Sequence, residues 1–227
     1  MAKAKTAFVC NDCGADFPKW QGQCGECHAW NTLSEIRLSG PASKSATGRS
    51  TGRSGYAGTT ASVQRLEEVA IVDLPRLRSG FDEFDRVLGG GFVPGSSILI
   101  GGHPGAGKST LLLQTLCRLA AQQPALYVTG EESPEQIALR ANRLGLPTDQ
   151  LRLMAETDVD AILASAEALN PRVLVVDSIQ VVHSETLTSA PGSVSQVRDC
   201  AAQLTRYAKQ TGTVLILVGH VTKDGSI

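Results

Sequence analysis

The chain has 227 residues, of which 42% are hydrophobic and 19% are charged, and its formal net charge is -1. This near-neutral charge excludes a protein-wide basic field for attracting nucleic acid. No apolar run approaches about eighteen residues, the length of a transmembrane helix, so we expect no membrane contact. Lysines occur in residues 1–6 but no apolar segment follows, so we expect no secretory signal and a cytoplasmic location. The length suits one sizeable domain and a small additional module.

The small module carries two CxxC pairs, Cys10 with Cys13 and Cys24 with Cys27, separated by ten residues. Cysteines of a cytoplasmic protein remain reduced, so this spacing favours a four-thiolate structural Zn²⁺ site over disulfides. The alternative is a c-type haem attachment site, because His28 directly follows Cys27. That alternative leaves the first pair without a role. We therefore assign residues 1–35 to a zinc-ribbon-like finger whose folding energy comes from the metal.

Residues 36–66 are rich in serine, threonine, glycine and alanine, which is typical of a flexible linker. The segment carries several arginines and lysines and no acidic residue. It is therefore either a tether that contacts a phosphate backbone or only a solubilising spacer. We place the main domain at residues 67–227.

A short apolar run at 98–101 leads into the pattern GxxxxGKS at 102–109, and an apolar helical pattern follows. Strand, loop and helix in this order are the context of a P-loop, whose backbone N–H groups surround a phosphate. A Cβ atom at Gly102 or Gly107 would obstruct that approach. Lys108 is expected to reach the β- and γ-phosphates of ATP and Ser109 to bind Mg²⁺. The expected nucleotide-binding residues are Gly102, His103, Pro104, Gly105, Ala106, Gly107, Lys108, Ser109 and Thr110.

Polar side chains close several of the apolar runs that follow. Glu131 and Glu132 come after the run at 125–129, Asp177 ends the run at 173–176, and His220 ends the run at 213–219. Helical patterns alternate with these runs, which predicts an α/β domain with a parallel sheet covered on both faces. Ligands of such sheets bind at the carboxyl ends of the strands, so we expect these side chains and the P-loop to share one site.

Hydrolysis of ATP requires charge stabilisation and an oriented water molecule. Lys108 and Mg²⁺ would provide the first, with Asp177 as the second Mg²⁺-site residue. We interpret Glu131 as the catalytic carboxylate that orients the water, although Glu132 is an alternative and one of the two is expected to be a solvated turn residue. His220 is either a sensor of the γ-phosphate or an ordinary hydrogen-bonded residue.

The motifs as a set resemble the bacterial RadA/Sms family of DNA repair and recombination proteins. The resemblance rests on the four-cysteine finger and on the sequences LGGGFVPGS at 88–96, YVTGEES at 127–133, SAPGSVSQVR at 189–198 and GHVTKDG at 219–225. It implies a RecA-like ATPase core, binding of single-stranded or branched DNA, ATP-driven branch migration, ring-shaped homo-hexamers and cooperation with a RecA-type recombinase. It also implies that Glu131 is the catalytic glutamate, that Asp177 is the Walker B aspartate, and that Lys223 lies in a DNA-contacting loop.

Members of that family continue well beyond the residues matched here, so we expect an incomplete core and impaired hydrolysis and hexamer assembly. The leading interpretation is a DNA-dependent ATPase of homologous recombination and repair. One alternative is a zinc protein that binds nucleotide without useful turnover. Another is a RecA-like ATPase that acts on a protein partner.

Overall fold

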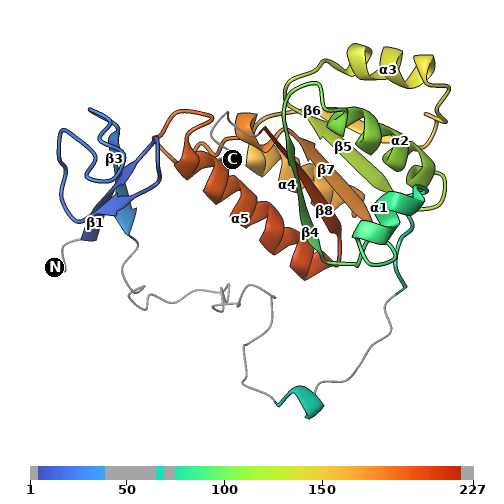
Figure 1. Cartoon of the computed structure of the whole chain (residues 1–227), viewed down its shortest axis with the longest axis horizontal. Helices are drawn as coiled ribbons and strands as arrows, with labels where there is room; N and C mark the ends of the chain where they lie inside the picture. Colours follow the sequence, from blue (N-terminus) through green and yellow to red (C-terminus); the bar gives the residue numbers. More distant parts are fainter. Residues whose placement is uncertain (1–4, 39–64, 69–74, 221–227) are drawn as a thin grey trace.

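The computed structural model describes residues 5–38, 65–68 and 75–220, and it contains two separate sheets (Figure 1). The first is antiparallel, with the strand order β2-β1-β3, and the second is parallel, with the order β4-β8-β7-β5-β6. The strands of the first sheet are β1 (Lys5–Cys10), β2 (Asp16–Phe17) and β3 (Leu33–Leu38). Those of the second are β4 (Ser97–Gly102), β5 (Ala125–Thr129), β6 (Arg152–Ala155), β7 (Val173–Asp177) and β8 (Val214–His220).

Five α-helices and two short 3-10 helices complete the described part of the chain. None of these helices is both long enough and apolar enough to cross a membrane. The α-helices are α1 (Asp82–Val87), α2 (Lys108–Ala120), α3 (Pro134–Arg143), α4 (Val159–Leu169) and α5 (Val194–Thr211), and the 3-10 helices are η1 (Leu66–Glu68) and η2 (Ile179–Val181).

The parallel sheet separates two apolar clusters. On one face, Leu112, Leu116 and other side chains of α2 pack with α1 and α3 against side chains such as Val175 and Ile216. On the other face, α4 and α5 cover side chains such as Leu174 and Leu215. Every residue of β5 and of β7 is buried, as expected for strands covered on both faces. The predicted α/β fold with a parallel sheet and a preceding four-cysteine finger is confirmed.

The finger extends further than the sequence indicated. β3 continues to Leu38, which lies opposite Lys5 of β1, so backbone pairing crosses the expected boundary at residue 35. The change in composition marks where serines and glycines become frequent, but backbone hydrogen bonds of a strand do not depend on composition. Most of the expected linker lies outside the described residues, which resume at residue 65.

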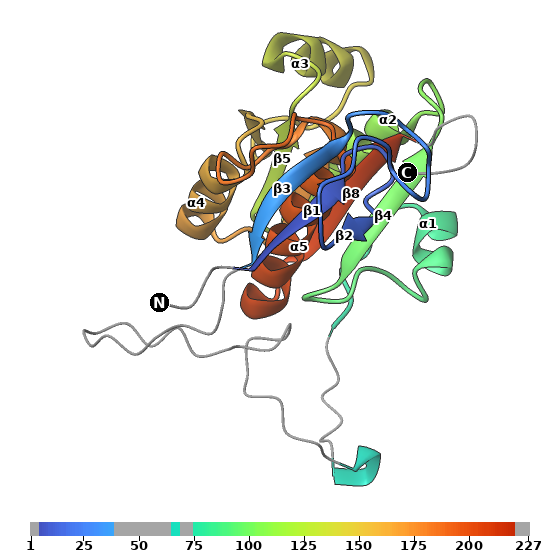
Figure 2. The same cartoon turned by 90° about the vertical axis from the view of Figure 1, so that its left-hand side faces the viewer.

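The finger lies against the first turn of α5 (Figure 1), and in the view from the side of the finger its strands lie in front of the parallel sheet (Figure 2). The backbone N–H of Val194 donates to the carbonyl of Asn11 at 3.3 Å, and Arg198 Nη1 donates to the carbonyl of Gly14 at 3.4 Å. Gly14 has a φ of +75°, and a Cβ atom there would lie 3.0 Å from Val194 Cγ1. Both the backbone conformation and the close approach therefore favour glycine at this position.

Candidate nucleotide-binding site and metal centre

The P-loop joins β4 to α2, as the sequence predicts. Gly105 and Gly107 have φ values of +81° and +87°, in the left-handed region that glycine adopts without strain. A Cβ atom at Gly105 or Gly107 would meet nothing within 4 Å, and one at Gly102 would meet only Lys108 and Ala106, at ordinary contact distances. Glycine at positions 105 and 107 is therefore explained by the positive φ angles, because no neighbouring protein atom would clash with a Cβ atom there.

A cavity of about 310 Å³ opens at the carboxyl edge of the parallel sheet, which is a volume at the lower end of small-molecule sites. The P-loop residues 104–110 form one wall. Side chains from three other strand ends form the rest: Tyr127, Thr129, Glu131 and Glu132 from the β5 end, Asp177 from β7 and His220 from β8, with Arg140 from α3. Every polar strand end singled out in the sequence thus lies in one cavity.

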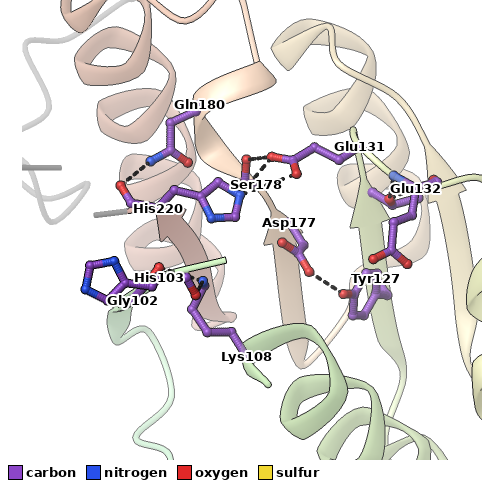
Figure 3. A network of polar contacts seen from close by, with 11 residues as sticks. Gly102, His103, Lys108, Tyr127, Glu131, Glu132, Asp177, Ser178, Gln180 and His220 are labelled. Atoms are coloured by element: carbon purple, nitrogen blue, oxygen red, sulfur yellow. Dashed lines mark hydrogen bonds and ion pairs between the residues drawn. The ribbon is translucent and has the colours of Figure 1, made fainter. Parts of the chain in front are cut away.

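Lys108 is buried, and its ammonium group is directed back onto the P-loop (Figure 3). Lys108 Nζ donates to the carbonyl of Gly102 at 2.7 Å and to the carbonyl of His103 at 3.0 Å. The imidazole of His103 points away from Lys108 and from the acidic side chains (Figure 3). Gly102 and His103 therefore contribute carbonyl groups that hold the lysine, whereas residues 104–110 line the cavity.

Asp177 has a partner that sequence reasoning missed. The hydroxyl of Tyr127 donates to Asp177 Oδ2 at 2.6 Å, and both residues are buried (Figure 3). Burial raises the pKa of the Tyr127 phenol well above its usual range, and the negative charge of Asp177 raises it further. Tyr127 therefore remains protonated and donates. The bond uses Oδ2, and in the described part of the chain Asp177 Oδ1 has no such partner, so it is available to a hydrated cation.

Glu131 is held by two side chains, one from the residue that directly follows β7 and one from the end of β8 (Figure 3). The Ser178 hydroxyl donates to Glu131 Oε1, and His220 Nε2 lies 3.1 Å from Oε1 and 3.3 Å from Oε2. Gln180 Nε2 donates to the carbonyl of His220 at 3.2 Å, which ties η2 to the end of β8. The contact places the predicted catalytic carboxylate and the predicted sensor next to each other.

Gly130 permits this arrangement. A Cβ atom at Gly130 would lie 2.3 Å from Val181 Cγ2, a separation that atoms do not reach without displacement. The end of β5 and η2 can approach closely only because residue 130 has no side chain. That approach brings Glu131 within reach of Ser178.

Glu132 has a different environment from Glu131. Arg140 Nη2 lies 2.6 Å from Glu132 Oε1 and 2.5 Å from Oε2. The exposed fractions of the two side chains are 21% for Arg140 and 34% for Glu132. The hydrogen bond to Glu132 raises the pKa of the Arg140 guanidinium, so the group is charged throughout the physiological range. Glu132 is thus neither a free carboxylate nor a solvated turn residue.

The four cysteines of the finger form a second candidate site. The Sγ atoms of Cys10, Cys13, Cys24 and Cys27 all lie within 4.8 Å of one another. Cys10 and Cys27 approach to 3.6 Å and Cys13 and Cys24 to 3.5 Å. Thiolates 2.3 Å from a tetrahedral Zn²⁺ are about 3.8 Å apart, so the cluster fits that ion. His28 adopts a left-handed backbone conformation and is exposed, and its side chain is not part of the cluster.

Several of these residues were not identified from the sequence. Tyr127, Ser178, Gln180 and Arg140 each act on a residue of another element, so no local spacing reveals them. The sequence position of two of them gave a weak indication. Ser178 directly follows Asp177, and Arg140 lies two turns into α3, which begins at the carboxyl edge of the sheet. Lys223, the expected DNA contact, lies outside the described residues.

Comparison with known proteins agrees with both sites. A family model described as an AAA domain matches residues 63–226, and one described as a rubredoxin metal binding domain matches residues 8–35. The chain is 60% identical over 230 residues to the DNA repair protein RadA of Escherichia coli K12, and 61% identical over 229 residues to that of Haemophilus influenzae. It is 45% identical over 232 residues to the RadA protein of Bacillus subtilis.

Each of these alignments covers 100% of this chain and 49% of the relative, so the chain spans about half the length of the curated relatives it matches. The motifs that carry the nucleotide and zinc interpretations are thus found in one protein family. The chain belongs to the RadA family, with an AAA domain as its main part and a four-cysteine zinc ribbon before it.

Proposed function

We propose that the chain is a zinc-containing ATPase whose hydrolysis of ATP depends on single-stranded or branched DNA and serves homologous recombination and repair. One observation carries the proposal: the P-loop, Asp177 and Glu131 meet in a single cavity at the carboxyl edge of the parallel sheet. This is where α/β domains bind nucleotides.

The residues of the cavity suggest a division of labour. Lys108, released from the carbonyls of the P-loop, would reach the β- and γ-phosphates, and the N–H groups of residues 104–110 would surround them. Ser109 and Asp177 would hold Mg²⁺, which supplies neutralisation of phosphate charge when bound. Tyr127 would keep the Asp177 carboxylate oriented for that purpose.

Glu131 would orient the attacking water and accept its proton. The water oxygen forms a bond to the γ-phosphorus, the bond from that phosphorus to the β–γ bridging oxygen breaks, and ADP and inorganic phosphate leave. In the structure His220 and Ser178 hold Glu131 on the side of η2. Movement of His220 toward a γ-phosphate would release Glu131, so His220 would act as the sensor of bound ATP.

The DNA part of the proposal is supported by the relatives, which are DNA repair proteins by name. The last residues of β7 and β8, Asp177 and His220, line the cavity, and we assign the DNA contacts to the chain that follows each of them, with Lys223 in the second segment. Homo-hexamer assembly, cooperation with a RecA-type recombinase and a cytoplasmic location belong to the same proposal.

Turnover of ATP with and without single-stranded DNA tests the proposal, with Glu131→Gln as the decisive variant. We expect Glu131→Gln to retain nucleotide binding and to lose at least about 100-fold in turnover, because the proton acceptor is removed. Glu167→Gln is the matched control, because Glu167 is exposed on α4 and does not line the cavity. Equal losses in both variants, or turnover indifferent to DNA, would contradict the proposal. Binding without turnover in the unmodified chain would favour a nucleotide-dependent switch.

A further inference from the structure

The nucleotide cavity holds more acidic side chains than hydrolysis requires. Glu131, Glu132 and Asp177 all line it, and the polyphosphate of ATP adds further negative charge. Mg²⁺ bound to Asp177 would offset the negative charge of that carboxylate. Glu131 is directed toward Ser178 and His220, which hydrogen-bond to it. Glu132 has neither arrangement, so as an isolated carboxylate it would oppose nucleotide entry.

We propose that Arg140 is a positioning residue of this site, which neutralises Glu132 and thereby allows the polyphosphate to enter a cavity that would otherwise be too acidic. The inference rests on the proposed ATP-binding function. It assigns Arg140 to Glu132 rather than to the nucleotide: Nη2 lies 2.6 and 2.5 Å from the two carboxylate oxygens.

The backbone on both sides of the pair is fixed, which makes it a built contact rather than a meeting of two mobile side chains. Thr129 Oγ1 accepts from the N–H of Glu132 at 3.1 Å and donates to its carbonyl at 2.9 Å. The start of α3 is fixed by a reciprocal pair of bonds in which Ser133 Oγ accepts from the N–H of Gln136 and Gln136 Oε1 accepts from the N–H of Ser133. Arg140 reaches back from the second turn of this helix to Glu132.

The pair also separates the two adjacent glutamates. Both oxygens of Glu132 are engaged by Arg140, whereas Glu131 faces the ends of β7 and β8. The two carboxylates therefore lie on different sides of the cavity, Glu132 toward α3 and Glu131 toward η2 and β8. Because Arg140 occupies both oxygens of Glu132, we assign the orientation of the water to Glu131 alone.

A double-mutant cycle tests the inference. The measured quantity is the affinity for a fluorescent, non-hydrolysable ATP analogue in the presence of Mg²⁺. We expect Arg140→Gln to weaken binding of the analogue about tenfold or more, because Glu132 then repels the phosphates. The double variant Arg140→Gln/Glu132→Gln is expected to recover an affinity within about threefold of the unmodified chain, because it restores the charge of the cavity. Glu132→Gln alone is expected to bind at least as tightly, since Arg140 then attracts phosphate. Arg143→Gln, on the exposed side of the same helix and outside the cavity lining, is the control.

A purely structural role of Arg140 would leave the double variant as weak as Arg140→Gln, since removal of a second charge does not repair packing. Direct contact of Arg140 with phosphate predicts the same result, so a double variant that stays weak overturns the inference in either case. Failure of the proposed function gives a different result: the unmodified chain would not bind the analogue, which would contradict both proposals. Melting curves of each variant verify that the fold is retained.

Discussion

The finger and the P-loop domain are stabilised by different means. Among the described residues, the buried apolar cluster of the finger consists of Cys10, Cys24 and Leu33, and two of these are candidate metal ligands. Trp20 and Trp30 are 57% and 68% exposed, so even its largest side chains are not in a core. The P-loop domain instead has an extensive apolar cluster on each face of its sheet. A small module depends on metal binding for its folding, whereas a domain with two full layers does not.

Loss of zinc is expected to have the largest effect on folding, and we expect this effect to be confined to the finger. Cys24→Ser replaces a buried ligand, and structural zinc contributes on the order of 10 kcal/mol to the folding of small modules. We expect loss of bound zinc and loss of amide protection in residues 5–38, with ATP-analogue affinity unchanged. Zinc content and hydrogen exchange measure both. Cys117→Ala, at a buried position of α2, is the control and should retain zinc. Collapse of nucleotide binding in Cys24→Ser would show that the two parts are not independent.

Removal of a large side chain from the parallel sheet is expected to destabilise the P-loop domain and to leave the finger unchanged. Leu174 of β7 is fully buried between the sheet and the helices α4 and α5, and Leu174→Ala should cost about 2–5 kcal/mol of unfolding free energy. The chain has two tryptophans, Trp20 and Trp30, both in the finger. Their fluorescence therefore follows the finger while far-UV circular dichroism follows mainly the domain. Only the second signal should shift to lower denaturant. Leu139→Ala, at a position that is 69% exposed, should shift neither.

A methyl group at Gly130 is expected to affect the site more than the fold. Gly130→Ala forces the end of β5 away from Val181 and should cost about 1–3 kcal/mol. Turnover should fall further than stability suggests, because Glu131 loses its contact with Ser178. Val181→Ala in the same chain removes the clashing methyl groups and should restore part of the lost turnover and part of the lost stability. A double variant no better than Gly130→Ala would show that the close approach at this glycine is not what positions Glu131.

The smallest effect concerns the start of α3. Ser133→Ala removes the side chain that accepts from the N–H of Gln136 and should cost about 1 kcal/mol. Ser133→Asp preserves an acceptor at this position and should be close to neutral. Chemical denaturation followed by circular dichroism measures both. Equal destabilisation by alanine and aspartate would mean that this cap does not stabilise the helix.

Short sequence patterns and the general geometry of parallel sheets were sufficient to predict three groups of site residues. The two CxxC pairs and the P-loop have short, fixed spacings. The polar strand ends are far apart in the sequence, but strands of a parallel sheet end at one edge, and the structure brings each set together. Side chains that act across elements were not predictable in this way. Tyr127 and Asp177 lie 50 residues apart in the sequence, and their contact depends on β5 and β7 being neighbours in the sheet.

Strand pairing in the finger was missed for a related reason. β1 and β3 pair over residues that are far apart in the sequence, and β3 passes through the point where the composition changes. Neither strand shows a clear alternation of apolar and polar residues, which is the pattern by which a half-buried strand is identified from sequence. The distinction between Glu131 and Glu132 likewise depended on Arg140, Ser178 and His220, none of which is a near neighbour of the pair in sequence.

We propose above that the cavity at the carboxyl edge of the parallel sheet is a site of ATP hydrolysis. The most direct test is the steady-state turnover of MgATP by the zinc-loaded chain, with and without single-stranded DNA, beside Lys108→Ala. We expect turnover that single-stranded DNA increases and that Lys108→Ala abolishes, because this variant lacks the ammonium group that would bind the phosphates. Turnover that persists in Lys108→Ala would show that hydrolysis occurs elsewhere and that this cavity is not the ATPase site.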